Sequence, residues 1–182
     1  GEGGGWVEKL AAGTLDEGPG GLVGARGLHE GHLYSAAVLL EEGKMMAQRF
    51  RRGLRNYGVF GEVRVCKKGP VAGPVSVRGV RIGIMLCEDM WFEEVAEALS
   101  ESGAQILVVM NGSPYEIDKD NSRLNFAVAR VQETGLPLIY VNQVGGQDEL
   151  VFDGGSFVLD ANNNLCLQAP RWERSLAISE WG

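Results

Sequence analysis

The sequence predicts an α/β fold with helices packed on a sheet, because strands and helices alternate through the middle of the chain. Val80–Leu86 (V-R-I-G-I-M-L) is a short apolar run of the kind that forms a buried strand. Asp120–Thr134 repeats apolar side chains at the i, i+3, i+4 and i+7 spacing of a helix. Gly103 and Gly135 end the two predicted helices, so a strand–helix–strand–helix–strand order results.

Before this alternating region, the sequence predicts a short helix and a β-meander. Trp6–Leu15 has apolar residues at helical spacing, and Gly-Pro-Gly-Gly at 18–21 ends that helix. An extended stretch begins at Leu22, and turns separate it from two further predicted strands, Leu33–Leu40 and Met45–Phe50. Three short strands joined by turns predict a meander.

The remaining elements follow in order along the chain. Residues 52–65 show no clear periodicity and are predicted to be irregular. From the apolar pattern we predict strand Val80–Leu86, helix Phe92–Ser102, strand Ile106–Met110, helix Asp120–Thr134, strand Leu136–Val141 and closing strands Val151–Asp160, Leu165–Gln168 and Leu176–Ser179.

Composition and charge argue against several classes of protein. The 182 residues are one domain's worth of chain, and a net charge of −7 without a dense basic run argues against nucleic-acid binding. No apolar run approaches the length of a membrane span, and no secretory signal is found. His29 and His32 lack the further ligands of a metal site. Cys66, Cys87 and Cys166 form no C-x-x-C pair, and free thiols predict a cytoplasmic location.

Cys87 lies where the strand Val80–Leu86 ends and a helix is about to begin. Catalytic nucleophiles favour such corners because amide groups at a helix start stabilise a thiolate and bind an oxyanion. Glu88 and Asp89 oppose a thiolate, so a nearby cation is needed to offset them. From the residues alone a structural role for Cys87 stays open, since free cysteine is among the most buried residue types.

Five ordered segments of the chain carry a family resemblance. They are G-I-M-L-C-E-D-M-W at Gly83–Trp91, N-Y-G-V-F at Asn56–Phe60 followed by Glu62, N-G-S-P-Y at Asn111–Tyr115, G-L-P-L-I-Y-V-N at Gly135–Asn142, and the long block Asn142–Phe157. Together they resemble the nitrilase superfamily, in the branch formed by the amidase domains of glutamine-dependent NAD synthetases. The resemblance covers nearly everything from Trp6 onward and implies the nitrilase-type α-β-β-α sandwich.

The resemblance implies amide hydrolysis by a Glu–Lys–Cys triad. Cys87 matches the cysteine whose thiolate attacks the amide carbonyl, so that ammonia leaves and water hydrolyses the thioester. Arg51 stands where the family has its lysine, whose ammonium stabilises the developing negative charge. Glu62 matches a second acidic residue that orients the catalytic groups. Without the resemblance, Arg51 would be a charged residue at a strand end; with it, the swap of lysine for the planar guanidinium predicts slow chemistry.

The resemblance also implies glutamine as the substrate. Tyr57, Glu88, Ser113 and Lys119 match the positions at which the family holds the α-amino and α-carboxylate groups of glutamine. A carboxylate can pair with the ammonium, while an ammonium and a hydroxyl can bind the carboxylate. The alternatives stay open: Lys119 is also readable as a solvated loop charge, and Glu88 as a carboxylate at a helix start.

Two family motifs are not found in the sequence. The P-E-L-type motif that carries the family's glutamate does not occur between Gly1 and Val80, and no S-G-G-x-D-S loop for ATP appears before Gly182. We therefore expect a sandwich lacking its N-terminal strand–helix–strand segment, with 1–5 as a flexible lead-in or fragment boundary and 6–182 as a partial amidase domain. The amidase step needs no cofactor, whereas ATP and Mg²⁺ belong to a synthetase domain. That domain, on the same longer chain or a separate subunit, is the expected partner, and we expect a homo-oligomer.

Three hypotheses about function follow. The first is a glutamine-hydrolysing amidase with low activity in this chain alone. The second is a non-catalytic piece or degenerate relative that keeps only the fold and its assembly surfaces. The third is a nucleotide-binding α/β domain, although no G-x-G-x-x-G motif follows a strand.

Overall fold

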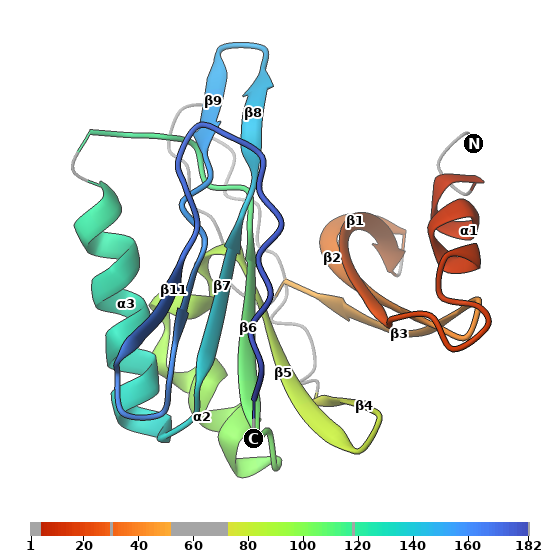
Figure 1. The fold of residues 1–182 in the computed structure, drawn as a ribbon, viewed down its shortest axis with the longest axis horizontal. Helices are drawn as coiled ribbons and strands as arrows, with labels where there is room; N and C mark the ends of the chain where they lie inside the picture. The colour runs from red at the N-terminus through yellow and green to blue at the C-terminus, as the bar shows by residue number, and fades with distance from the viewer. Residues whose placement is uncertain (1–4, 30, 52–72, 118, 182) are drawn as a thin grey trace. The chain divides into compact units, whose positions relative to one another are not determined.

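The computed structural model describes residues 5–29, 31–51, 73–117 and 119–181 (Figure 1). The chain forms two compact units, Gly1–Arg51 and Arg52–Gly182. Within these described ranges, none of the helices combines the length and the apolar character needed to cross a membrane.

The first unit contains the predicted short helix and the predicted β-meander of three antiparallel strands, and the helix packs on the meander. Its elements are helix α1 (Gly5–Ala12) and strands β1 (Gly21–His29), β2 (His32–Glu41) and β3 (Lys44–Phe50), paired in the order β1-β2-β3. The middle strand β2 is buried throughout residues 36–40. Ala11 of α1 and Val38 and Leu40 of β2 form a small core, so the apolar face of the helix is what holds it to the sheet.

The second unit is built on a six-stranded mixed sheet in the order β11-β10-β7-β6-β5-β4. Its elements are β4 (Val75–Val77), β5 (Val80–Leu86), the 3₁₀ helix η1 (Cys87–Trp91), α2 (Glu93–Glu101), β6 (Ile106–Asn111), α3 (Lys119–Thr134), β7 (Leu138–Asn142), β8 (Val144–Gln147), β9 (Leu150–Asp153), β10 (Phe157–Leu159) and β11 (Leu165–Gln168). β5, β6 and β7 run parallel, and the outer strands are antiparallel. β8 and β9 form a separate hairpin.

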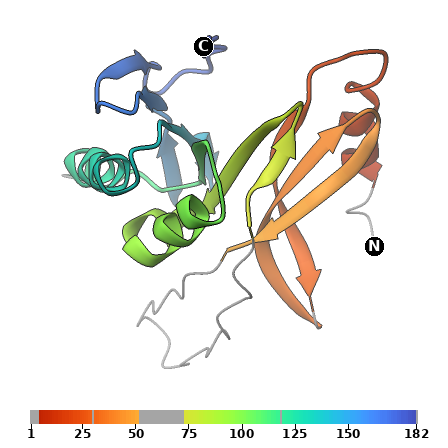
Figure 2. The same ribbon diagram turned by 90° about the horizontal axis from the view of Figure 1, so that it is seen from below.

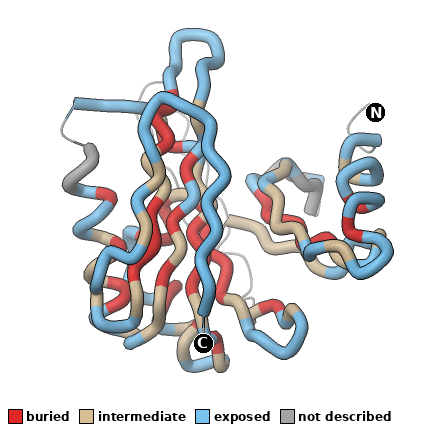
Figure 3. Tube along the Cα trace, viewed as in Figure 1, coloured by how far each residue is buried: buried red, intermediate tan, exposed pale blue. Residues whose placement is uncertain are grey.

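Helices α2 and α3 cover one face of this sheet (Figure 2). The burial is concentrated along the strands (Figure 3). Side chains from the strands and from both helices form the core, among them Met85, Leu107, Val109, Leu138, Tyr140, Ala96, Leu99, Ala127 and Val131. Gly83 lies where helix and sheet approach closely, because a Cβ there would be 3.0 Å from Leu107 Cδ2 and 3.2 Å from Ala104 Cβ. The same Cβ would be 3.3 Å from Leu99 Cβ of α2, so a larger residue at this position would require its neighbours in the helix and the sheet to shift.

The structure confirms the alternating strands and helices and corrects three details. The single closing strand predicted over Val151–Asp160 is wrong, because Gly154 and Gly155 have φ of 72° and 67° and separate β9 from β10. The strand predicted at Leu176–Ser179 is also wrong. Leu176 and Ile178 there are 93% and 81% exposed, and a short apolar stretch without a neighbouring strand has no ladder to join. Strands β4 and β8 were not predicted.

Candidate active site

The carboxyl ends of the three parallel strands meet along one edge of the six-stranded sheet, called the carboxyl edge below. Leu86 at the end of β5 lies opposite Met110 in β6. Asn111, which ends β6, lies opposite Asn142, which ends β7. Cys87 follows Leu86 directly and is therefore level with the two asparagines. Ligand sites of open α/β sheets lie at this edge.

Cys87 has an unusual backbone conformation. Its φ is 52°, in the left-handed region that residues other than glycine seldom adopt. The residue is half-buried and begins the 3₁₀ helix η1 directly after β5. Backbone strain of this kind occurs where a side chain must be held in one direction, and functional sites are a common place for it. The sequence predicted the strand–helix corner but gave no sign of the strain.

Two buried acidic residues follow the cysteine in η1. Glu88 is 5% exposed and Asp89 is 2% exposed. The Asp89 carboxylate accepts a hydrogen bond from the backbone N–H of Leu86 at 3.1 Å, so it ties η1 back to the end of β5. At the other end of η1, Arg130 of α3 donates to the carbonyl oxygen of Met90 at 3.3 Å. The turn that carries Cys87 is thus held at both ends.

The segment after β6 brings a serine to the same edge. Ser113 is 7% exposed, and its backbone N–H donates to the Asn142 side-chain oxygen at 3.1 Å. The Asn142 amide nitrogen in turn donates to the carbonyl oxygen of Gly154 at 2.9 Å. Among the described residues, no hydrogen bond uses the Ser113 hydroxyl. This hydroxyl is therefore available to a ligand.

A buried ion pair supports the Ser113 segment from behind. Arg123 Nη1 lies 2.9 Å from Asp153 Oδ1 and 3.0 Å from Oδ2, and the Asp153 side chain is 0% exposed. Arg123 Nη2 donates to the carbonyl oxygens of Ser113 and Pro114 at 3.1 and 3.2 Å. One guanidinium thus joins α3, the end of β9 and the segment after β6.

Tyr140 interacts electrostatically with the ion pair of Arg123 and Asp153 and with Cys87. Its side chain is 1% exposed, and its hydroxyl accepts a hydrogen bond from the Asn111 amide nitrogen at 2.8 Å. Burial raises the pKa of Tyr140 to about 12; Asp153 and Cys87 add to the rise, whereas Arg123 and the hydrogen bond from Asn111 oppose it. The hydroxyl therefore lies within electrostatic range of both the thiol and the ion pair.

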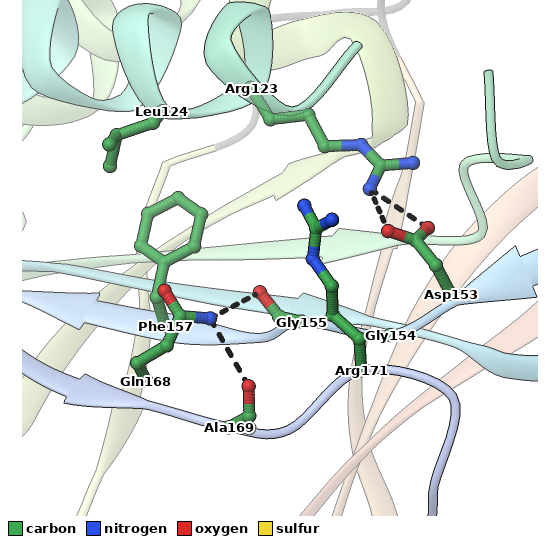
Figure 4. Close-up of a pocket in the computed structure, with 9 residues that line it drawn as sticks. All are labelled: Arg123, Leu124, Asp153, Gly154, Gly155, Phe157, Gln168, Ala169 and Arg171. Carbon is green, nitrogen blue, oxygen red and sulfur yellow. Dashed lines mark hydrogen bonds and ion pairs between the residues drawn. The ribbon is translucent and has the colours of Figure 1, made fainter. Parts of the chain in front are cut away.

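A cavity of about 270 Å³ lies beside the ion pair and is shown in Figure 4. Its lining residues come from α3, the end of β9, the turn after it, the start of β10, and the end of β11 with the segment after it: Arg123, Leu124, Asp153, Gly154, Gly155, Phe157, Gln168, Ala169 and Arg171. Gln168 closes one side by donating to the carbonyl oxygens of Gly155 and Ala169 (Figure 4). Cys87 does not line this cavity, so the cavity is not the pocket of the thiol.

The structure describes some of the predicted site residues and not others. Cys87, Glu88 and Ser113 all lie in the second unit, on the two segments that follow β5 and β6. Arg51 follows β3 in the first unit, where its backbone N–H donates to the Ser35 carbonyl oxygen, so its pairing with the thiol stays a prediction. Lys119 is described only as the first residue of α3. Tyr57 and Glu62, like Cys66, lie outside the described residues.

Sequence reasoning did not assign roles to Arg123, Asp153, Asn142 or Tyr140. Arg123 and Asp153 are 30 positions apart, and no local pattern joins them. Asp153 and Asn142 fall inside the long family-like block, and their place in that block was the only sequence signal that they have a role. Their partners come from the fold and not from the spacing.

Comparison with known proteins shows which family and fold the chain matches. The carbon-nitrogen hydrolase family matches residues 7–181. A glutamine-dependent NAD(+) synthetase of Rhodobacter capsulatus is 41% identical over 170 residues, which are 93% of this chain and 31% of that protein. The structure of glutamine-dependent NAD+ synthetase from Acinetobacter baumannii, in complex with ADP, matches with a TM-score of 0.79 at 33% identity, over 93% of this chain and 32% of that one.

A structure with lower sequence identity has a similar fold. The carbon-nitrogen hydrolase from Helicobacter pylori G27 has a TM-score of 0.79 at 21% identity, over 93% of this chain and 64% of that one. These structures confirm the predicted nitrilase-type α/β fold. The chain spans about a third of the length of the NAD synthetases that it matches. On the family match and on these relatives, the chain belongs to the carbon-nitrogen hydrolase family.

Proposed function

We propose that this chain is a glutamine amidohydrolase module that supplies ammonia for ATP-dependent NAD synthesis, with Cys87 as its nucleophile. The observation that carries the proposal is the backbone of Cys87, which has a φ of 52° directly after β5, at the carboxyl ends of three parallel strands. A buried structural cysteine needs no such strain. A nucleophile gains from it, because the strain fixes the direction of attack before substrate arrives.

The chemistry follows from the groups at the carboxyl edge. The Cys87 thiolate attacks the side-chain amide carbon of glutamine, and the new C–S bond replaces the C–N bond as ammonia leaves with a proton. Water then breaks the C–S bond and gives glutamate. Glu88 is suited to pair with the α-ammonium of the substrate, and the Ser113 hydroxyl, together with Lys119 and Tyr57, to hold the α-carboxylate.

We further propose that turnover by this chain is slow, with Arg51 and Glu62 in the supporting catalytic roles. Arginine carries a permanent charge and suits an oxyanion, but its planar fork does not present charge at the point where a lysine ammonium would. An oxyanion donor that is removed costs about 2.7–4 kcal/mol of transition-state stabilisation, so modest misplacement suffices to slow the reaction.

The proposed context is a complex in the cytoplasm. The synthetase domain, which uses ATP and Mg²⁺, receives the ammonia, and the amidase step itself needs no cofactor. The relatives named as glutamine-dependent NAD synthetases support this assignment. A homo-oligomer is part of the same proposal.

Alkylation by a chloromethyl ketone analogue of glutamine tests the proposal. The thiolate displaces chloride and forms a stable thioether, so the adduct accumulates even where turnover is slow. We expect saturable labelling of Cys87, protected by glutamine. Cys166 is the internal control, because it is exposed and free and should react with iodoacetamide but not saturably with the analogue.

Peptide mapping of all three cysteines gives the result. Equal, non-saturable labelling of Cys87 and Cys166 would contradict the proposed function and favour the non-catalytic alternative. Ammonia release measured with glutamine then shows how slow the turnover is.

A further inference from the structure

Helix α3 carries two buried arginines that face the sheet. Arg123 and Arg130 are 6% and 7% exposed and are two helical turns apart, on one side of α3. Each donates to backbone carbonyl groups of a segment that follows a parallel strand. Arg130 holds Met90 in the segment after β5, and Arg123 holds Ser113 and Pro114 in the segment after β6.

The backbone of Ser113 is held on both sides. Its N–H donates to Asn142, and its carbonyl oxygen accepts from Arg123. Because both polar backbone groups are held, the Cα–Cβ bond of Ser113 points in one direction, while the hydroxyl makes no hydrogen bond to another described residue. A hydroxyl held in this way is pre-organised for a ligand.

From these contacts we infer that Arg123 is a positioning residue for substrate recognition, acting through Ser113, and that Asp153 holds Arg123 in place. The inference rests on the proposed function and adds to it a residue that does not itself contact substrate. Asp153 binds one side of the guanidinium with both carboxylate oxygens, which leaves the Nη2 group directed at the two carbonyl oxygens. Figure 4 shows the pair of Arg123 and Asp153 at the wall of the cavity.

Lysine cannot replace Arg123 in this role. The guanidinium donates in two directions at once from a rigid plane, whereas an ammonium is a single point at the end of a flexible stem. Arg123→Lys therefore keeps the charge beside Asp153 but loses the fork that reaches Ser113. Weaker positioning of the Ser113 hydroxyl should weaken recognition of the substrate carboxylate and leave the thiol itself unchanged.

The test compares two alkylating agents on the full chain. We expect Arg123→Lys to raise the half-saturating concentration of the chloromethyl ketone analogue roughly tenfold, the effect of one lost charge-assisted hydrogen bond. The rate with iodoacetamide, which has no carboxylate, should change by less than about twofold, because such a reagent does not need Ser113. In a Ser113→Ala background the effect of Arg123→Lys on the analogue should disappear, since both changes act on one contact.

Arg130→Lys is the matched control. It alters a buried arginine on the same helix with the same kind of carbonyl contact, but one made to Met90. Because that contact holds the turn that carries Cys87, we expect Arg130→Lys to change labelling by iodoacetamide and by the analogue together. A change of the iodoacetamide rate in Arg123→Lys as large as in Arg130→Lys, or an effect of Arg123→Lys that persists beside Ser113→Ala, would show a general loss of order and overturn the inference.

The remaining outcomes are also decisive. Non-saturable labelling of the unaltered chain overturns the proposed function, and the inference falls with it. Saturable labelling that Arg123→Lys leaves unchanged overturns the inference alone. If Arg123→Lys does not fold, as judged by circular dichroism, Asp153→Asn replaces it; this change leaves the guanidinium present but removes the charge that orients it. Half-saturation should then rise about threefold, and an unchanged value overturns the inference.

Discussion

The interior of the six-stranded sheet and its carboxyl edge are both buried, but different forces hold them. Leu107 and Leu138 in the interior are 0% exposed and belong to the hydrophobic core cluster, so packing stabilises them. Asp153 and Asn142 at the edge are 0% and 7% exposed, and each is surrounded by hydrogen-bond partners. Burial alone therefore does not distinguish the hydrophobic core from the candidate active site, whereas the chemistry of the buried atoms does.

The difference has an energetic consequence. An interior side chain loses free energy in proportion to the contacts that a smaller residue gives up. A buried polar side chain that is removed leaves its partners without water and without a bond, so the cost includes the desolvation of those partners. We therefore expect the edge to be at least as sensitive to substitution as the interior.

Removal of Asp153 should produce the largest effect on stability. Asp153→Ala leaves the Arg123 guanidinium buried beside an empty position, and breaking one partner of a buried ion pair costs about 3–5 kcal/mol. Chemical denaturation measures the free energy of unfolding. Glu133→Ala is the comparison, because Glu133 pairs with Arg130 but is itself 34% exposed, so water can take the place of its carboxylate and we expect a smaller cost. Equal losses of unfolding free energy in the two variants would mean that the buried ion pair at the carboxyl edge contributes no more than the pair of Arg130 and Glu133.

An interior truncation comes next in size. Leu138→Ala removes a fully buried side chain from β7, and a cavity of this kind costs about 2–5 kcal/mol. The same change at Leu165 of β11, which is 51% exposed, should cost no more than about 0.5 kcal/mol. A cost at Leu138 well above that at Asp153 would mean that packing, not polar contact, dominates throughout this unit.

The same contrast explains what the sequence could predict. The predicted bounds are correct for the strands Val80–Leu86 and Leu165–Gln168, because turns flank each apolar run and mark where the strand begins and ends. At the edge only Cys87 stood out from local pattern, and Glu88 and Ser113 came from the family resemblance. Arg123 meets Asp153 across 30 positions of chain. Pairings of this kind depend on the sheet order β10-β7-β6-β5, which no local period specifies.

The strain at Cys87 should be measurable as a small difference between two variants. At φ of 52° alanine keeps the strain and glycine releases it, so Cys87→Gly should be more stable than Cys87→Ala by about 1–2 kcal/mol. Cys166 lies at the register shift of β11 but does not have a positive φ, and there the order should reverse, with glycine less stable than alanine by about 0.5–1 kcal/mol. The same order at both cysteines would argue against strain at Cys87 and against the observation that carries the proposed function.

Tyr140 belongs to both regions, since its ring lies in the core and its hydroxyl at the edge. Tyr140→Phe keeps the ring but removes the acceptor of the Asn111 amide, and we expect a loss of about 1 kcal/mol, as for one ordinary hydrogen bond. This is smaller than the effect of Leu138→Ala because the apolar volume stays filled. Denaturation of Tyr140→Phe beside Asn111→Ala and the double variant would isolate the contact, and fully additive losses would mean that the hydrogen bond contributes nothing.

The titration of Tyr140 provides an independent measurement of how far its hydroxyl is removed from water. Burial raises its pKa to about 12 in the folded chain, against an ordinary value near 10, so between these two pH values the folded state holds a proton that the unfolded state has released. Its contribution to stability is therefore full below pH 10 and falls as the pH rises toward 12. Ultraviolet difference spectra should show a phenol that ionises near pH 12, and Tyr140→Phe should remove that late step. Loss of an early step instead would place the hydroxyl in water, where it could not sense the thiol or the ion pair.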